Sequence, residues 1–468
     1  MNNMRINIFS YLVAISLVVS PSVTSFLVPG GIQEQHHRSY AAASTGHPTS
    51  TTIVASTINP FGDHSSVQQS PISPQRLRLN HALAASSSSQ IDNTSTSESN
   101  ISLENLSSKR VLVVGGSGRV GGSVVCQLTK HNAIVVVGGK KLESFQQSQA
   151  RWKELFPTFA DNFDSIPFHS INREDATSIA NILLEAEKSE QKIDLVVHTA
   201  GPFQGKVNSP NGVIQACVEH GVAYIDVCDD YCTARAAKAK YTQTALDANV
   251  PCILSTGCWP GVSSLMAKQL TQSVLEKRTH LKPEDLNVDF NFFTAGSGGA
   301  GATLLVATFL ILSEESLMIV NGRRKEVPAM KEYSRIHFGE KVGDKDVAHL
   351  NLLEAASCHD VLGIGNVKTL FGTAPNFWNT LLGLMAQLPS SFLANEPLME
   401  KLAIFSLPIV RVVDYFAGAT NAMRVDVSCE KDASVKEMAL YAHENLEPCV
   451  GECVSAFCAA LLSGSVRP

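Results

Sequence analysis

Short apolar runs alternate with longer amphipathic stretches through residues 109–277. The apolar runs have the length of buried strands, and the stretches between them, such as residues 142–156 and 176–187, carry apolar residues at helical spacing. This strand–helix rhythm is typical of a parallel sheet covered by helices on both faces, so the pattern predicts a doubly wound α/β domain of the Rossmann type. The predicted strands are residues 110–114, 134–137, 165–168, 195–198, 223–227 and 252–254.

The pattern changes after about residue 278. A helix is expected from Ala302, and the Asn321–Gly322 pair between apolar residues predicts a hairpin. We expect a second domain of the α+β class, residues 278–468, packed on the first and serving substrate binding or dimerisation. Its remaining elements are predicted as strands at residues 288–293, 347–352, 367–372 and 423–427 and a last helix at residues 434–462.

The first 108 residues lack both patterns. Arg5 precedes an apolar run at residues 9–19, which has the length of a signal-peptide core and is too short to span a bilayer. The small residues Val23 and Ser25 predict cleavage after Ser25, giving a signal peptide at residues 1–25. Residues 26–108 are rich in Ser and Thr and poor in acids, so we expect a disordered transit peptide or linker.

This arrangement resembles the bipartite plastid presequence of algae with complex plastids, in which Phe26 would begin the transit peptide. The resemblance implies a plastid (chloroplast) protein. The alternative is a secreted protein with a disordered linker. The 11 cysteines form no C-x-x-C pair, and their odd number favours reduced, packed thiols over a zinc site or a disulfide framework, with a metal or redox role as the alternative.

The charge and hydropathy of the chain limit the classes of molecule that it is expected to bind. The formal net charge is −6, and the sequence contains no run of Lys and Arg residues of the kind that binds phosphates along a nucleic acid. Nucleic acid is therefore not an expected partner. After the presequence, no segment reaches the ~18 apolar residues of a membrane-spanning helix. A small-molecule substrate is the expected ligand, and no metal site is predicted.

A glycine cluster directly follows the first predicted strand. Gly116, Gly118 and Gly121 have the spacing G-x-G-x-x-G, and Gly115 adds an overlapping G-x-x-G-x-x-G. Between a strand and a helix, such glycines let backbone approach a pyrophosphate at the helix N-terminus, so the cluster predicts a dinucleotide site. The alternative is a glycine turn that serves packing only. The residues assigned to the cofactor here are Gly115, Gly116, Ser117, Gly118, Arg119, Val120 and Gly121.

The end of the second strand predicts which dinucleotide binds. NAD sites usually carry an acidic residue there, about 20 residues after the glycines, to hold the ribose 2′-hydroxyl. This chain has Lys140 and Lys141 instead, and Arg119 in the glycine loop. Cations attract a 2′-phosphate, so the prediction is NADP(H). The alternative is that the two lysines are solvated surface charges.

Five segments together resemble the saccharopine dehydrogenase-like family of NADP-binding proteins. They are "VLVVGGSGRVGG", "VVVGGKKLE", "VVHTAGPFQGK", "VIQACVEHGVAYIDVCDDY" and "LSTGCWPGVSSLMA", and they cover residues 109–276. The second domain is similar only in outline, through "TAGSGGAG", "FGTAP" and "NAMRVDV". The resemblance implies hydride transfer, and it places a loop beside the nicotinamide ribose: Ala200, Gly201, Pro202 and Phe203. The family does not specify one substrate.

Proton-transfer groups are harder to assign. Asp226, Asp229 and Asp230 end the fifth strand, where they would orient a substrate or cap the next helix. We name Asp230 and Ser263 as the candidate catalytic residues. Trp259 stands where amino-acid dehydrogenases of the family carry an acid; an indole there favours an apolar or planar substrate, or simply seals the domain junction.

Glycines at positions 296, 298, 299 and 301 offer amides to an anionic group or form a hinge. The resulting hypothesis is an NADP(H)-dependent oxidoreductase that acts on an unidentified small organic substrate between two domains. One alternative is a non-catalytic NADP-binding sensor or scaffold. Another is a reductase of a lipid or isoprenoid, suggested by the apolar residues 302–312 and 380–407, which core helices would equally explain.

Overall fold

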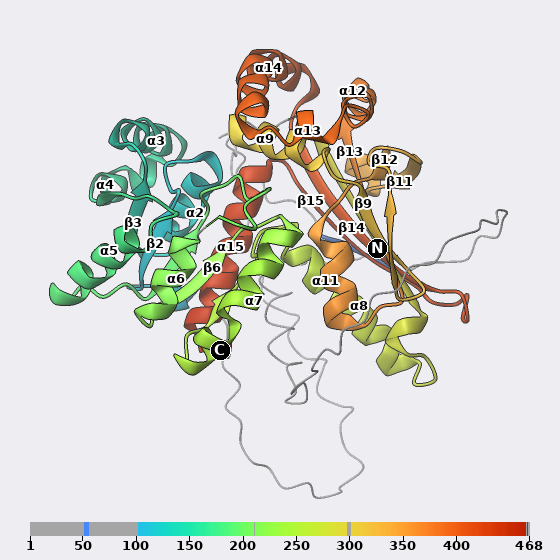
Figure 1. Ribbon diagram of the computed structural model, residues 1–468, viewed down its shortest axis with the longest axis horizontal. Coiled ribbons are helices and arrows are strands. Elements are labelled where there is room, and N and C mark those ends of the chain that lie inside the picture. Colours follow the sequence, from blue (N-terminus) through green and yellow to red (C-terminus); the bar gives the residue numbers. More distant parts are fainter. Residues whose placement is uncertain (1–50, 56–101, 210, 297–300, 465, 467–468) are drawn as a thin grey trace, which may run out of the picture.

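The computed structural model describes residues 51–55, 102–209, 211–296, 301–464 and 466 (Figure 1). The predicted signal peptide and most of the predicted transit peptide lie outside these residues, as do Gly298 and Gly299. A six-stranded parallel sheet has the order β4-β3-β2-β5-β6-β7. Its strands are β2 Arg110–Val114, β3 Ile134–Gly139, β4 Phe168–Ser170, β5 Leu195–His198, β6 Ala223–Asp226 and β7 Cys252–Ile253.

Helices cover both faces of this sheet, which confirms the predicted Rossmann-type fold. The alternation along β2 shows why: Val111 and Val113 enter one apolar core, while Leu112 and Val114 enter the other. The helices in this part are α2 Arg119–Lys130, α3 Leu142–Leu155, α4 Ala160–Asp164, α5 Ala176–Lys188, α6 Gly212–Glu219, α7 Tyr231–Asp247 and α8 Val262–Lys277.

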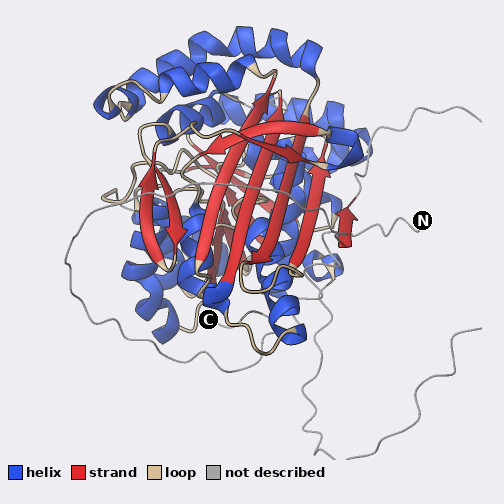
Figure 2. Ribbon diagram, turned by 90° about the vertical axis from the view of Figure 1, so that its right-hand side faces the viewer, coloured by secondary structure: helices blue, strands red, loops and turns tan. Residues whose placement is uncertain are grey.

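The second half of the chain builds a mixed sheet, seen face-on in Figure 2. Its central path is β15-β14-β8-β13-β12-β11, and β9 joins the edge of β13 and pairs with β10 as the predicted hairpin. The strands are β8 Leu286–Ala295, β9 Ser316–Val320, β10 Arg323–Val327, β11 Ser334–His337, β12 Asp344–His349, β13 Asn366–Ala374, β14 Thr420–Cys429 and β15 Lys436–His443. Its helices are α9 Ala302–Ile311, α10 Gly339–Val342, α11 Leu353–Leu362, α12 Phe377–Met385, α13 Ser390–Leu393, α14 Glu396–Ala417 and α15 Leu446–Leu462.

Four sequence-based expectations differ from the structure. The strand predicted at residues 165–168 overlaps β4 only at Phe168. The predicted helix at residues 434–462 is wrong over its first part, because residues 436–443 form β15, whose backbone pairs along its length with β14. The predicted strand at residues 347–352 begins earlier and ends at His349. A short strand, β1 Thr51–Ala55, pairs in parallel with β15, although the composition of residues 26–108 predicts no folded structure.

The last helix returns to the first sheet and joins the two halves. In Figure 1, α15 runs between them, and it packs along α2. A Cβ at Gly451 would lie 2.4 Å from Ser123 Oγ, so this glycine permits the close approach of the two helices. One continuous core therefore extends from β2 through α15 and α8 to the second sheet.

Helices α12, α13 and α14 form an outer layer at the top of Figure 1. Apolar side chains on these helices face solvent, among them Phe405, which is 75% exposed, and Phe416, which is 81% exposed. Beneath them, α14 packs on α9. Among the described residues, no helix has both the length and the apolar character needed to cross a bilayer.

Candidate active site

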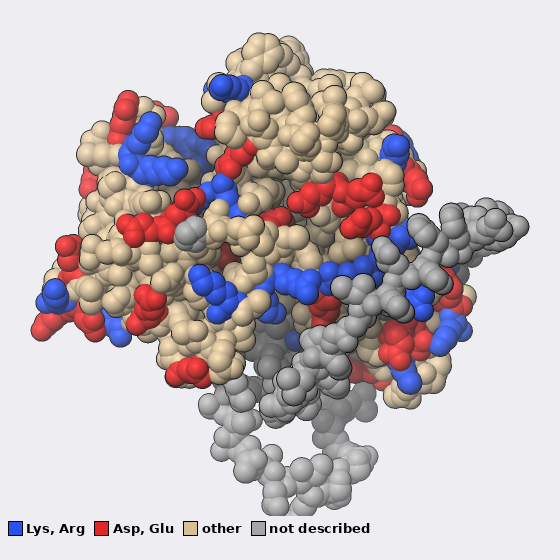
Figure 3. Space-filling view, viewed as in Figure 1, with Lys and Arg blue, Asp and Glu red and all other residues tan. Residues whose placement is uncertain are grey.

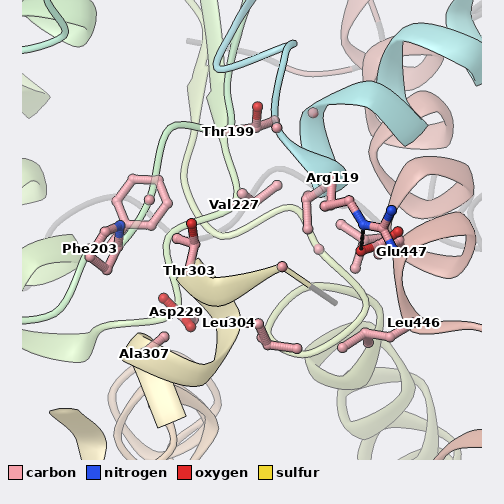
Figure 4. Close-up of a pocket in the computed structure, with 18 of the residues that line it drawn as sticks. Arg119, Thr199, Phe203, Val227, Asp229, Thr303, Leu304, Ala307, Leu446 and Glu447 are labelled. Atoms are coloured by element: carbon pink, nitrogen blue, oxygen red, sulfur yellow. Dashed lines mark hydrogen bonds and ion pairs between the residues drawn. The ribbon is translucent and has the colours of Figure 1, made fainter. Parts of the chain in front are cut away.

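Four loops of the first sheet converge on one cavity of about 260 Å³. They follow β2, β5, β6 and β7, so the cavity lies at the carboxyl ends of these parallel strands, where α/β sheets bind ligands. The N-terminal part of α9 and the start of α15 close the opposite side (Figure 4). The lining includes Gly118, Arg119, Val120, Gly121, Thr199, Gly201, Pro202, Phe203, Gln204, Val227, Asp229, Trp259, Thr303, Leu304, Ala307, Leu446 and Glu447.

The glycine loop fits a bound phosphate group. A Cβ at Gly121 would lie 2.2 Å from the Gly115 carbonyl oxygen, and one at Gly115 would lie 2.7 Å from the Ala200 nitrogen. The loop is therefore as compact as backbone allows. Gly118 is the N-cap of α2, and the first-turn amides of a helix have no partner within it, so they remain available to an anion. This cradle has the donor set that a dinucleotide pyrophosphate requires.

The loop after β5 is held from below by an arginine. The Arg173 guanidinium donates to the Ala200 carbonyl oxygen and, at 3.3 Å, to the Pro202 carbonyl oxygen. Gly201, Pro202 and Phe203 line the cavity, as predicted for the nicotinamide loop. Ala200 supports it as the close neighbour of Gly115. The predicted cofactor loops are thus brought together.

The predicted phosphate-binding cations are placed on two sides of the glycine loop. Lys140 and Lys141 follow β3 directly and are exposed, outside the cavity wall. Arg119 lines the cavity, and its Nε donates to Glu447 Oε1 of α15 at 3.0 Å. Burial raises the pKa of Glu447, which Arg119 and Arg151 partly offset. The positions of the lysines match the prediction, and their role remains a prediction.

Among the acids after β6, Asp229 faces the cavity. Burial raises the pKa of Asp229 to about 6. The neighbouring acids Asp230 and Asp226 raise this pKa further, whereas the Gln204 side chain lowers it in part. Asp226 has a structural role, since its Oδ1 accepts hydrogen bonds from the backbone amides of Cys228 and Ser255. A carboxyl group that titrates near neutrality at the edge of a cavity is suited to proton transfer.

The two candidate catalytic residues named from the sequence lie outside this wall. Asp230 accepts the Thr233 amide at 2.7 Å as the N-cap of α7. Ser263 is completely buried and donates to Glu354 at 2.8 Å, joining α8 to α11. Both side chains have structural partners, and their catalytic assignment remains a prediction without support from the cavity.

Several residues of the cavity wall are not predicted by any sequence pattern. Gln204 follows the recognised nicotinamide loop by one position, and Glu447 arrives with α15. Thr303 and Leu304 come from α9, which had been expected to be a core helix. Trp259 lies in the wall and also contacts the Phe292 ring, with centroids 5.1 Å apart, so it both seals the junction and faces the ligand space.

A larger groove of about 920 Å³ lies between α7 and α8. The glycine loop and the loop after β5 contribute nothing to this groove, so the predicted cofactor loops meet at the smaller cavity and not here. In the described part of the chain, no group of three or more His, Cys, Asp or Glu side chains could hold a metal ion. Each of the eleven cysteines is a free thiol.

The fold and the cavity define a dinucleotide-binding α/β domain, and sequence comparison gives its type. The profile of the saccharopine dehydrogenase NADP binding domain matches residues 111–252, which span the first sheet from β2 to the start of β7. This part of the chain is therefore an NADP-binding domain, and the predicted cofactor, NADP(H), is confirmed. The predicted family resemblance is confirmed for this domain. The second half lies outside the match.

No curated protein sequence has a significant match to this chain. Among solved structures, apo saccharopine dehydrogenase (L-Glu forming) from Saccharomyces cerevisiae is 10% identical, with a TM-score of 0.46, covering 76% of this chain and 92% of that one. An alcohol dehydrogenase from the archaeon Thermococcus sibiricus, complexed with 5-hydroxy-NADP, is 12% identical, with a TM-score of 0.24, covering 31% and 74%. At such low identity, no functional residue can be carried over from either protein.

Proposed function

We propose that this protein is an NADP(H)-dependent oxidoreductase whose substrate binds between the two sheets. The observation that carries the proposal is that the glycine loop, the predicted nicotinamide loop and Asp229 line one cavity. When bound, NADP(H) supplies or accepts a hydride at its nicotinamide ring. A second, smaller hollow continues from this cavity beneath α9, so there is room for another molecule beside the cofactor.

Asp229 is the proposed proton-transfer residue. It borders both hollows, so its carboxyl group lies where cofactor and substrate would meet. With a pKa of about 6, it holds a proton in mildly acidic solution and releases it near neutrality. The protonated form donates during reduction, and the carboxylate accepts during oxidation.

Replacement of Asp229 tests this proposal. With any substrate that a screen of NADPH oxidation identifies, Asp229→Asn should lower kcat roughly 100-fold or more, the usual range for loss of a general acid. Calorimetric NADPH affinity should stay within about twofold. In the full-length protein, reduction should be fastest below pH 6 and slow as pH rises through the pKa, because only protonated Asp229 donates.

Asp230→Asn is the matched control, since asparagine also caps helices. It should retain activity and the pH profile. A full rate in Asp229→Asn would refute the assignment of Asp229. NADPH binding without oxidation by any metabolite pool would favour a sensor or scaffold instead.

A further inference from the structure

The hollow beneath α9 has a volume of about 120 Å³ and is named here the inner chamber. It lies between the loops of the first sheet and the inner face of the second. Leu304 and Ala307 form part of its wall and also border the cofactor cavity, so the two spaces adjoin. The lining consists of Gln204, Asp229, Trp259, Pro260, Thr294, Leu304, Ala307, Thr308, Ile311, Leu350, Leu352, Phe371 and Leu446.

This wall is unsuited to a charged substrate. No arginine, lysine or histidine occurs among its described residues. A substrate carboxylate would lose its hydration without gaining a cationic partner, and Asp229 would repel it when ionised. Away from Asp229 and Gln204, the polar groups of the described wall are uncharged: the hydroxyls of Thr294 and Thr308 and the indole N–H of Trp259. The Thr308 hydroxyl already donates to the Leu304 carbonyl oxygen.

One polar side chain in the wall is only partly satisfied by the protein. Gln204 is only 6% exposed; its side chain lies against the Asp229 carboxyl group, whose pKa it lowers, and its amide has no other partner among the described residues. A buried amide with few partners costs free energy, so such groups usually gain partners in the working state. Gln204 borders both spaces, so a molecule bound in either one lies within reach of its amide.

We infer that the inner chamber binds an uncharged, mainly apolar carbonyl compound or the corresponding alcohol. This inference rests on the proposed oxidoreductase function. The hydrocarbon body lies against the leucines, Ile311 and Phe371, and the single oxygen meets Asp229 and Gln204. In reduction, the carbonyl carbon gains a hydride from the reduced cofactor and the π-electron pair moves to oxygen. That oxygen takes the proton of Asp229, which solvent then restores.

Two aldehydes of equal chain length, one neutral and one charged, distinguish the effect of substrate charge from the effect of substrate size. Nonanal and 9-oxononanoic acid differ in one terminal carboxylate. We expect kcat/KM with NADPH to be at least 100-fold higher for nonanal. Along the series from hexanal to nonanal, KM should fall by about fourfold per methylene, since each buried CH₂ contributes ~0.8 kcal/mol. Equal or better use of the oxo acid would overturn the inference.

A charge in the wall should reverse the preference. Leu304→Lys should improve use of the oxo acid relative to nonanal, while Leu304→Met, the matched control, should not. Binding of 1-nonanol and 9-hydroxynonanoic acid to the NADP⁺-loaded protein is measured by calorimetry, which needs no turnover. If nonanol binds and no aldehyde is reduced, the proposed function fails and the chamber assignment stands. If neither alcohol binds, or the acid binds better, the chamber assignment fails.

A separate observation concerns the surface above this chamber. The apolar cap is defined here as the outward side chains of α12, α13 and α14, and its top is almost free of charge in Figure 3. An exposed apolar patch that extends over three helices is larger than the surface of a soluble monomer usually carries. The cap comprises Phe377, Leu381, Leu384, Phe392, Ile404, Phe405, Ile409, Val412, Tyr415 and Phe416, together with Leu388 in the connection between α12 and α13, and these residues are between 41% and 84% exposed.

We propose that the cap rests on a lipid membrane surface. Helix α14 carries two exposed cations, Lys401 and Arg411, which can reach lipid phosphates, and one exposed acid, Glu400, so the apolar side chains rather than net charge carry the docking. The aromatic residues suit the interface between headgroups and acyl chains. The cap is also continuous with the chamber wall, because α14 packs on α9 and α9 lines the chamber, so an apolar substrate dissolved in lipid would lie close to its site.

Vesicle flotation tests this docking. Full-length protein should float with vesicles of phosphatidylcholine and 30% phosphatidylglycerol, and Phe405→Ser combined with Phe416→Ser should reduce the bound fraction at least fivefold. Val361→Ser is the control, because Val361 is 69% exposed on α11, outside the cap. Protein that stays in solution would overturn the proposal. If the same double variant converts a dimer into a monomer without affecting flotation, the cap is an interface between copies of this chain.

Discussion

At the scale of single residues, Lys140 carries the clearest prediction about cofactor choice. It follows β3 and is exposed, at the position expected for the 2′-phosphate of NADP(H). Loss of one well-ordered charged contact should weaken the binding of NADPH about tenfold, since ~1.4 kcal/mol of binding free energy is a factor of ten in affinity. Lys140→Ala should leave NADH nearly unchanged, because NADH lacks this phosphate. Titration calorimetry with both cofactors measures the two effects.

Lys130→Ala is the control for this prediction, because Lys130 ends α2 at the far side from the glycine loop. Lys140→Asp should lower NADPH affinity further by repulsion. High salt should narrow the preference for NADPH, since exposed charges are screened over ~8 Å at physiological ionic strength. An equal loss for NADPH and NADH would show that the lysine is only a surface charge.

The sequence predicts the backbone of the site better than its side chains. The glycine spacing is sufficient to place the phosphate cradle, because Gly115 and Gly121 meet backbone that no Cβ could approach. The choice between Asp229 and Asp230 is different. Both follow the same strand, and only the path of the loop decides that one borders the cavity and the other caps α7. No periodicity exists in such a loop, so sequence patterns cannot resolve it.

At the scale of helices and strands, the contact between α8 and α11 contains a buried acid. Burial raises the pKa of Glu354 to about 7, although the hydrogen bond from Ser263 lowers it in part. A carboxyl group with a raised pKa stabilises the fold most below its unfolded value near 4.5, and this contribution is lost as pH rises through about 7. Above neutral pH, ionised Glu354 therefore lowers the free energy of unfolding.

Glu354→Gln should remove this cost. Chemical unfolding at pH 8 should show the variant more stable than wild type by up to about 3 kcal/mol, with little difference at pH 4.5, since one pKa unit equals ~1.4 kcal/mol. Glu154→Gln, at an exposed position of α3, is the control and should change the free energy of unfolding by less than about 0.5 kcal/mol. A variant that is less stable at pH 8 would contradict this account.

The elements of the second half show where periodicity fails. Residues 436–443 were predicted as the beginning of a helix, yet they form β15 because β14 offers its edge for pairing. Likewise, α15 packs on α2 across more than 300 positions, which no local pattern encodes. In contrast, five of the six strands of the first sheet were located, since buried parallel strands are short apolar runs between helices, and only β4 at the sheet edge was misplaced.

At the scale of the whole molecule, we propose that residues 1–108 direct the protein to plastids. Support comes from the apolar run, the predicted cleavage after Ser25 and the hydroxyl-rich stretch that follows. In an alga with complex plastids, a fluorescent reporter fused to these residues should enter the plastid stroma. Replacing Phe26 with Ala should retain the reporter outside the inner plastid membranes. Secretion of the unmodified fusion would contradict the proposal.

The central claim is that cofactor and substrate meet at Asp229, between the two sheets. A crystal structure of the protein with NADP⁺ tests it most directly. We predict the pyrophosphate at the first turn of α2, the nicotinamide between the loop containing Gly201 and the Asp229 carboxyl group, and the 2′-phosphate beside Lys140. NADP⁺ bound in the groove between α7 and α8, or with its nicotinamide directed away from Asp229, would contradict the account.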